Sequence, residues 1–282
     1  MPEIELQVHL AERMTMPKIH IEVELTENGF YRNGCVEEFF TEPMAVQDVH
    51  RYNAHYQAET RSWDVTKLDQ DLAVSHTKWT ESTLELTSVS QAPQKTLLIL
   101  MESPHNDEYT YLDAEGAEVR IPVVGDRALA VGRIAQARPV RPANGQTGAH
   151  MDKWLETVLQ AVDWPETASF RVIVGNPIQF QTSLHAIHGG TLSKKPFAQL
   201  RDRVWMALWG VDEIQSDFHG RLTAYNPDLI LNGCTSVPKS LVDEALRAQY
   251  GGNSESPWCY RVAHPYAWFT PGNRRLTRLT LD

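Results

Sequence analysis

Residues Thr96–Met101, TLLILM, form a continuous apolar run that is followed directly by the polar residues Glu102-Ser103-Pro104-His105-Asn106. A run of this length between turn signals is typical of a strand that is buried on both faces of a parallel sheet. Three later runs have the same character: FRVIVG at Phe170–Gly175, DLILN at Asp228–Asn232 and WCYRVA at Trp258–Ala263. The four runs predict the strands of an α/β sheet.

Apolar residues at helical spacing predict helices between these strands. The first stripe consists of Met151, Trp154, Leu155, Val158, Leu159 and Val162. A second stripe runs from Phe197 to Leu208, and a third runs from Pro238 to Leu246 and is ended by Gly251-Gly252. One-sided stripes of this kind pack a helix against a sheet. The alternation predicts a three-layer α/β/α fold with a central, mainly parallel four-stranded sheet.

The bulk composition is that of an ordinary globular protein. Hydrophobic residues make up 42% and charged residues 22% of the 282 residues, which excludes disordered, collagen-like and coiled-coil chains. The net charge of −10 argues against a protein that holds nucleic acid by overall basicity. The charge is uneven, however, because residues 1–90 hold 7 Lys+Arg against 16 Asp+Glu, whereas the rest of the chain holds 19 against 20. The later region is therefore close to neutral.

The acidic first third differs in pattern from the remainder. It contains short alternating segments, Lys18–Leu25 and Gly29–Tyr31, around the turn signal Glu27-Asn28-Gly29. The Ser/Gln/Pro-containing stretch Ser88–Gln94 is the best candidate for a boundary. We expect an N-terminal accessory region at 1–90 and an α/β catalytic domain at 91–282.

Cysteine usage and hydropathy predict where the protein works. Cys35, Cys234 and Cys259 are odd in number and far apart, so they form neither a disulfide framework nor a four-cysteine metal site. No apolar stretch reaches signal-peptide length at the start or the roughly 18 residues of a membrane span. We expect a cytoplasmic protein with no membrane contact and no obligatory protein partner.

Polar residues follow each apolar run, at the place where an open α/β sheet binds its ligands. They are Glu102-Ser103-Pro104-His105, Asn176-Pro177, Gly233-Cys234-Thr235 and His264-Pro265. Each segment alone is also explained by a proline turn, a helix cap or a structural histidine. Together, they would converge a carboxylate, an amide and an imidazole on one crevice.

On these motifs the region 95–282 resembles the uracil-DNA glycosylase superfamily, whose strands end in a loop of the type G-[EQIM]-x-P-[GY], in Asn and in His-Pro. Met101–His105, Val172–Asn176 and His264–Trp268 occupy those places, and Asp228–Gly233 resembles the family's strand-and-glycine element. The resemblance implies a monofunctional DNA glycosylase that needs no metal or cofactor and that acts on a flipped nucleotide.

The resemblance also implies roles for individual residues. Glu102 stabilises positive charge on the sugar or orients water, and His264 donates a hydrogen bond to the departing base. Asn176 reads the Watson–Crick edge of the flipped base. The remaining base-binding positions are Ser103, Pro104, His105 and Val123.

A DNA-contacting surface is predicted near the C-terminus. By resemblance, the wedge residue that fills the gap of a flipped base falls on Trp268, with Phe269 beside it, although both could be core aromatics. The following strip contains Arg274 and Arg275, and residues 261–282 hold four Arg and one Asp. Cations that could extend this surface, or simply form a solvated face, are Arg133, Arg138, Arg141, Lys194 and Lys195.

Departures from the family pattern favour an unusual substrate. Ser103 and His105 stand where the uracil-specific branch has aspartate and tyrosine, and Val123 in Ile121–Gly125 stands where the iron–sulfur branch has a stacking aromatic. The cluster cysteines of that branch are absent. The chain therefore resembles divergent members that act on modified bases, including prokaryotic anti-phage glycosylases that remove glucosylated hydroxymethylcytosine.

Three alternatives remain open. The protein could be an ordinary uracil or mismatch repair glycosylase, or a catalytically silent module that binds flipped bases. A metal-dependent phosphoesterase would use His105, Asp107 and Glu108 with the pair His185 and His188, but these residues lack a credible ligand spacing, so no metal site is predicted.

Overall fold

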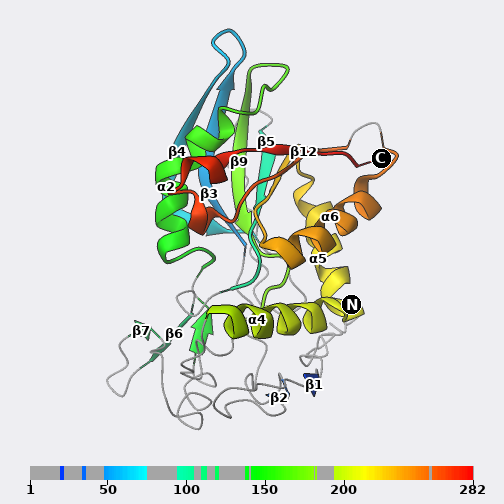
Figure 1. Ribbon diagram of the computed structural model, residues 1–282. Coiled ribbons are helices and arrows are strands. Elements are labelled where there is room, and N and C mark those ends of the chain that lie inside the picture. The colour runs from blue at the N-terminus through cyan, green and yellow to red at the C-terminus, as the bar shows by residue number, and fades with distance from the viewer. Residues whose placement is uncertain are drawn as a thin grey trace, which may run out of the picture.

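The computed structural model describes residues 20–21, 34–35, 48–74, 94–104, 109–112, 118–120, 137–139, 141–180, 182, 194–253 and 256–281. Its main element is a mixed seven-stranded sheet with the order β12-β11-β10-β5-β9-β3-β4 (Figure 1). The strands are β3 (Val49–Gln57), β4 (Ser62–Ala73), β5 (Lys95–Leu100), β9 (Ala168–Gly175), β10 (Leu229–Asn232), β11 (Trp258–Arg261) and β12 (Thr277–Leu279).

The four apolar runs of the sequence are neighbours in this sheet. β9, β5, β10 and β11 pair in parallel, in that order. β5, β10 and the second half of β9 are buried, as strands covered by helices on both faces are, whereas β11 is half-buried. The antiparallel strands β3 and β4 extend the sheet beyond β9, and β12 extends it beyond β11. The predicted α/β class is confirmed, whereas the sheet has seven strands where four were expected.

β3 and β4 come from the region that was expected to be accessory. β3 pairs with β9, and its inward residues Tyr52, Ala54 and Tyr56 are buried while Asn53 faces outward. The predicted boundary between residues 90 and 91 therefore lies between strands of one sheet. The sequence did not indicate β3 because polar residues such as His50 and Arg51 lie within it and obscure its alternation.

Helices cover both faces of the sheet (Figure 1). α2 (Gln146–Leu159) packs on one face, where Leu97, Ile99 and Val172 contribute to the core. α4 (Lys194–Trp209), α5 (Asp212–Tyr225) and α6 (Ser236–Tyr250) pack on the other face, with Leu98, Leu100 and Ile173. Neighbouring residues of β5 thus point to opposite cores. The three predicted helices are confirmed, and the described parts of their apolar stripes are buried, with Val204 and Leu208 representing the stripe of α4.

α5 has no counterpart among the predicted helices. It buries Asp217 and Arg221 beside Ile214, Phe218 and Leu222, so charged residues interrupt its apolar stripe. It ends at Asn226, which has a left-handed backbone conformation with φ 42°. A short polar residue of this kind tolerates that conformation at a helix end.

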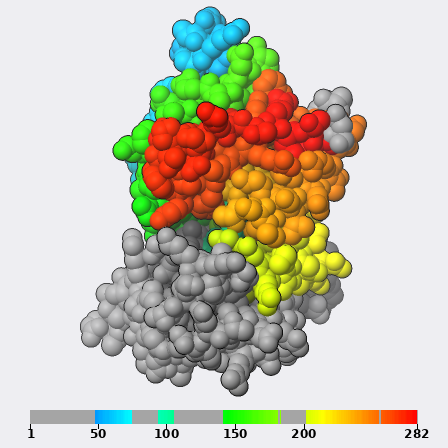
Figure 2. Space-filling model, in the orientation of Figure 1, coloured from blue at the N-terminus to red at the C-terminus, as the bar shows by residue number. Residues whose placement is uncertain are grey.

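The remaining elements are short. β1 (His20–Ile21) pairs with β2 (Gly34–Cys35), and β6 (Tyr109–Leu112) pairs with β7 (Glu118–Arg120) and β8 (Ala137–Pro139). β1 lies within the predicted Lys18–Leu25, whereas Gly29–Tyr31 lies outside the described residues. The 3-10 helices η3 (Pro265–Ala267) and η4 (Pro271–Arg274) follow β11. Figure 2 shows this C-terminal segment, in red, on the surface beside α2. No helix in the described part of the chain is long and apolar enough to cross a membrane.

Candidate functional site

The polar segments that follow the four parallel strands lie along one edge of the sheet. Leu100 is level with Gly175 on β9 and with Asn232 on β10, and Asn232 is level with Arg261 on β11. Backbone hydrogen bonds extend past the strand ends, from Met101 N to Gly175 O (2.9 Å) and from Gly233 N to Leu100 O (2.8 Å). Since neighbouring strands are about 4.8 Å apart, the loops that follow β5 and β11 are separated by about 10 Å.

A topological switch point lies between β5 and β10. The chain leaves β5 toward β9 with α2 on one face, and it leaves β10 toward β11 with α6 on the opposite face. Ligands of open α/β sheets bind in the crevice at such a point. Glu102 follows β5 and Thr235 follows β10, and the Thr235 hydroxyl donates a hydrogen bond to the Glu102 carboxylate across this switch point.

The carboxylate of Glu102 is held by two side chains, one from α4 and one from the loop that follows β10. Its side chain is buried, Arg201 Nε from α4 lies 2.9 Å from its Oε1, and Thr235 bonds its Oε2. Trp205 Nε1 donates to the Glu102 backbone carbonyl at 3.0 Å. Burial raises the pKa of Glu102, and the charge of Arg201 opposes that rise. The result is an oriented carboxylate in a largely dry environment.

The residues that follow Glu102 also take part in the loop packing. Ser103 Oγ and Thr182 Oγ1 share a hydrogen bond of 2.6 Å, which connects the loop after β5 to the chain that continues from β9. Pro104 is buried. His105 and Val123, which were predicted to bind the base, lie outside the described residues.

Asn176 is enclosed, and its backbone and its side chain differ sharply in their partners. Its backbone N–H donates to Asp48 Oδ1 (3.2 Å), and its carbonyl accepts from Arg221 Nη1 (3.1 Å) and Gln179 Nε2 (3.3 Å). By contrast, side-chain atoms Oδ1 and Nδ2 are buried and have no hydrogen-bond partner within the described structure. Buried polar atoms are nearly always paired, so an unpaired amide is a candidate for ligand binding.

A buried charged network holds the loop that carries Asn176. Asp48 Oδ2 accepts hydrogen bonds from Arg221 Nη1 (2.7 Å) and the Tyr225 hydroxyl (2.9 Å). Arg221 Nη2 also donates to the Pro177 carbonyl at 2.9 Å. A Cβ at Gly175 would lie 2.7 Å from the Asp48 carboxyl carbon, so this position requires glycine.

Sequence reasoning missed Asp48 and Arg221. Asp48 precedes β3 in the region taken as accessory, and Arg221 lies on the helix that was not predicted. Neither residue belongs to a short motif, so no local signal marked them.

His264 is partly exposed at the end of the fourth parallel strand. It is the N-cap of η3, and its Nδ1 accepts a hydrogen bond from the Tyr266 backbone N–H at 3.2 Å. Because Nδ1 accepts, the neutral imidazole carries its proton on Nε2 and can act as a donor there. Pro265 packs closely on Gly233, where an added Cβ would lie 3.2 Å from Pro265 Cδ. The loops after β10 and β11 are therefore in contact.

The predicted wedge role does not fit Trp268. Its side chain is fully buried in the core on the α2 face, and its Nε1 donates to the Ala263 carbonyl at 2.8 Å. The prediction was wrong because an aromatic side chain after a strand can pack inward or outward. Phe269 is 59% exposed and Tyr266 is 51% exposed, and both rings lie within 6 Å of the His150 ring.

The two predicted arginines differ in their contacts. Arg274 Nε donates to the Trp268 carbonyl at 2.6 Å, and its guanidinium lies 3.4 Å from the centre of the Trp154 ring, so this residue braces the segment. Arg275 is exposed. Arg141 is exposed and bonds Asn144. The side chains of Arg133, Arg138, Lys194 and Lys195, like His185 and His188, are outside the described part of the structure.

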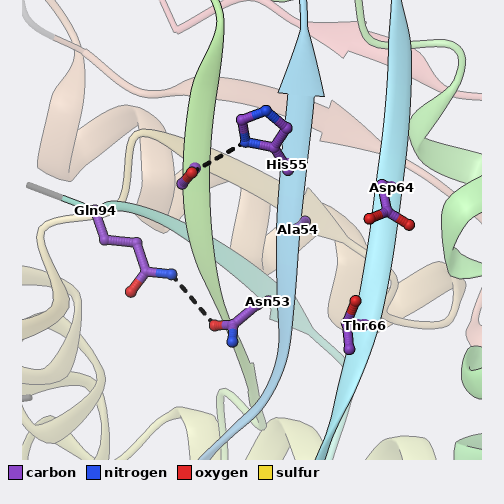
Figure 3. Close-up of a pocket in the computed structure, with 7 residues that line it drawn as sticks. Asn53, Ala54, His55, Asp64, Thr66 and Gln94 are labelled. Carbon is purple, nitrogen blue, oxygen red and sulfur yellow. Dashed lines mark hydrogen bonds between the residues drawn. The ribbon is translucent and has the colours of Figure 1, made fainter. Parts of the chain in front are cut away.

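No group of three or more His, Cys, Asp or Glu side chains that could hold a metal occurs among the described residues. A shallow hollow of about 220 Å³ lies on the outer strands and is lined by Asn53, Ala54, His55, Asp64, Thr66, Gln94 and Ser169 (Figure 3). Gln94 donates to Asn53 (3.2 Å) and His55 bonds Ser169 (3.0 Å), so several of its polar groups are paired with one another. None of the predicted site residues lines it.

Comparison with protein-family models, curated proteins and solved structures found no match for this chain. The candidate site is therefore defined by the arrangement of its residues and not by similarity to a known protein. An α/β sheet places a buried carboxylate, an enclosed amide and an imidazole after three of its parallel strands. That combination can orient a polar heterocycle and stabilise opposite charges at its two ends.

Proposed function

We propose that this protein is a monofunctional DNA glycosylase, which flips a base out of DNA and hydrolyses its N-glycosidic bond to leave an abasic site. The observation that carries the proposal is the Asn176 amide, whose donor and acceptor are buried without partners on the strand next to that of Glu102. A base taken out of the helix presents paired donors and acceptors on its edge. Because Asn176 is enclosed, the base must displace the side chains that cover the amide before it binds.

The chemistry of N-glycoside hydrolysis suits the neighbouring groups. As the bond breaks, its electron pair goes to the base and positive charge develops on the sugar. The Glu102 carboxylate stabilises that charge, orients the water whose oxygen bonds C1′, and accepts the proton that this water loses before passing it to solvent. Burial strengthens the electrostatic effect. His264 Nε2–H donates to the departing base, which leaves as a stabilised anion. The proposed reaction uses no metal and no cofactor.

A DNA strand would lie over the segment that follows β11. Tyr266 and Phe269 offer exposed aromatic rings for stacking, and Arg275 offers a charge for a phosphate. This segment begins at His264, so a strand bound there passes the edge of the sheet that carries the candidate site. Phe269 replaces Trp268 as the proposed wedge because it is the exposed one of the pair.

The substrate we propose is a modified base, with glucosylated 5-hydroxymethylcytosine in phage DNA as the candidate and antiviral defence as the role. Its support is the departure from the family pattern at Ser103 and Val123, where smaller residues stand in place of an aspartate and an aromatic ring. A wider pocket would admit a substituent on the base.

The test is release of the base from defined DNA. The full-length protein is incubated with duplexes that contain uracil, 5-hydroxymethylcytosine or its glucosylated form, with chelator and without added metal, and alkali then reveals abasic sites as strand breaks. We expect breaks at the modified base, and a preference for uracil would instead indicate a repair glycosylase. No breaks on any duplex at high enzyme concentration would overturn the proposal.

A second candidate is a catalytically silent module that binds flipped bases. The contacts of Glu102 favour it, since Arg201 and Thr235 already engage both carboxylate oxygens. This module would bind the same DNA tightly without releasing the base, so the same duplexes distinguish the two functions.

A further inference from the structure

Gln179 carries a second buried amide beside Asn176. Its side chain is 1% exposed, and its Nε2 donates to Asp48 Oδ1 (2.6 Å) and to the Asn176 backbone carbonyl (3.3 Å). A carboxylate and a carbonyl only accept hydrogen bonds, so the amide must present its nitrogen to them. This contact fixes Oε1 as the atom on the other side of the Gln179 amide.

Gln179 Oε1 has no hydrogen-bond donor within the described structure, although it is buried. The bond lengths of an amide place Oε1 about 2.2 Å from Nε2, and therefore within about 6 Å of the Asn176 carbonyl. The loop that follows β9 thus holds three buried side-chain atoms without partners in the described structure: the donor Asn176 Nδ2 and the acceptors Asn176 Oδ1 and Gln179 Oε1. Leaving such atoms unpaired is costly, so a ligand that pairs them gains affinity.

We propose that Gln179 selects bases that bear an exocyclic amino group, an inference that rests on the proposed binding of a base at Asn176. Asn176 Nδ2 would donate to the ring nitrogen, Asn176 Oδ1 would accept one amino hydrogen, and Gln179 Oε1 would accept the other. The edges of cytosine and adenine have this pattern, whereas uracil and hypoxanthine place a carbonyl oxygen at the same position. That oxygen would face Gln179 Oε1 as acceptor against acceptor.

The experiment compares bases that differ in this group. Two pairs serve, 5-hydroxymethylcytosine with 5-hydroxymethyluracil and adenine with hypoxanthine, each placed opposite an abasic-site analogue so that base pairing does not differ. Base release by the unaltered protein is measured for each, and binding of the same DNA by Glu102→Gln is measured by fluorescence anisotropy. We expect release and binding to favour the amino member of at least one pair.

A variant tests whether Gln179 is the cause. Gln179→Leu should lower the preference for the amino member about threefold to tenfold, the effect of one hydrogen bond. Gln160→Leu is the control, because the Gln160 amide bonds the backbone of Trp63 far from this site, and it should leave the preference unchanged. The ratio of the release rates for two bases does not depend on the fraction of the variant that is folded. If the variant does not fold at all, the comparison of the two bases by the unaltered protein still tests the proposed preference.

The outcomes separate this inference from the proposed function. Release that favours the oxo base or neither base overturns the role of Gln179 and leaves the glycosylase intact. Binding that favours the amino base without release overturns the glycosylase and leaves the selection by Gln179 intact. Neither release nor preferential binding overturns both.

Discussion

The carboxylate of Asp48 accepts a hydrogen bond from the backbone N–H of Asn176 at 3.2 Å, across 128 residues of sequence. The same carboxylate pairs with Arg221 at 2.7 Å, and Arg221 in turn donates to the Asn176 carbonyl at 3.1 Å. A residue before β3 and a residue on α5 therefore position the loop that follows β9. The side-chain amide of Asn176 makes no hydrogen bond in this network, and it is the group that we propose binds the base.

Replacing Asp48 should destabilise the fold. Asp48→Asn leaves the buried guanidinium of Arg221 with Asp217 as its remaining ion-pair partner, and we expect a loss of about 3 kcal/mol in the free energy of unfolding. Asp69→Asn, an exposed position on β4, should change it by less than about 0.5 kcal/mol. Denaturant unfolding measures both variants. Equal stabilities would show that the network does not hold the loop.

Removing either proposed catalytic group should lower activity without unfolding the protein. Glu102→Ala and His264→Ala should each reduce single-turnover base release by about 10²–10³-fold, because each group stabilises charge that develops in the transition state. Glu156→Ala, an exposed carboxylate on α2, should have no effect. Circular dichroism checks the fold. Wild-type release rates in either variant would remove that residue from the mechanism.

The pH dependence of activity should respond to Arg201. Glu102 acts as the carboxylate, and since burial raises its pKa, activity is lost as the pH falls through a value above the usual range of glutamate. Arg201→Met removes the charge that opposes this rise, so the acidic limb of the profile should move to higher pH. Arg203→Met changes an exposed arginine of the same helix and should leave the limb in place. A limb that moves to lower pH in Arg201→Met, or does not move, contradicts the assignment.

The neighbouring aromatics Trp268 and Phe269 should behave in opposite ways. Trp268→Ala empties a fully buried site and should cost about 3–5 kcal/mol of unfolding free energy. Phe269→Ala removes an exposed ring, so stability should change little while the dissociation constant for DNA rises about tenfold through lost stacking. Unfolding curves and anisotropy titrations give the two quantities. Unchanged DNA affinity in Phe269→Ala would exclude the wedge role.

Arg275 should contribute one phosphate contact. Arg275→Ala should reduce the slope of log affinity against log salt by about 1, because one fewer counterion is released. Arg61→Ala serves as a comparison, because Arg61 is exposed on the turn between β3 and β4, at the edge of the sheet opposite the candidate site. Titrations at several salt concentrations measure both slopes. An unchanged slope in Arg275→Ala would remove this residue from the DNA surface.

The parts of the fold that could be predicted are those in which a short stretch of sequence shows, by its hydrophobicity and spacing, that it is buried. Leu97–Met101 and Val172–Gly175 are buried on both faces, so their residues are apolar without interruption, and the stripe of α2 has a regular spacing. β3 and α5 could not be predicted because Arg51 and Arg221 are buried within them, each paired with a distant carboxylate. The sequence of one segment does not indicate that its arginine will pair with a carboxylate from another segment.

The amino-acid sequence alone determined the α/β class, the order of the parallel strands along the chain, and the polar residues at their ends, because periodicity and hydrophobicity act over a few residues. Only the tertiary structure decided that Asp48 lies beneath Asn176, that Arg201 and Thr235 hold Glu102, and that Trp268 points inward while Phe269 points outward. These relationships depend on which strands become neighbours and on which charges remain paired after water is excluded. Both are properties of the whole packed chain.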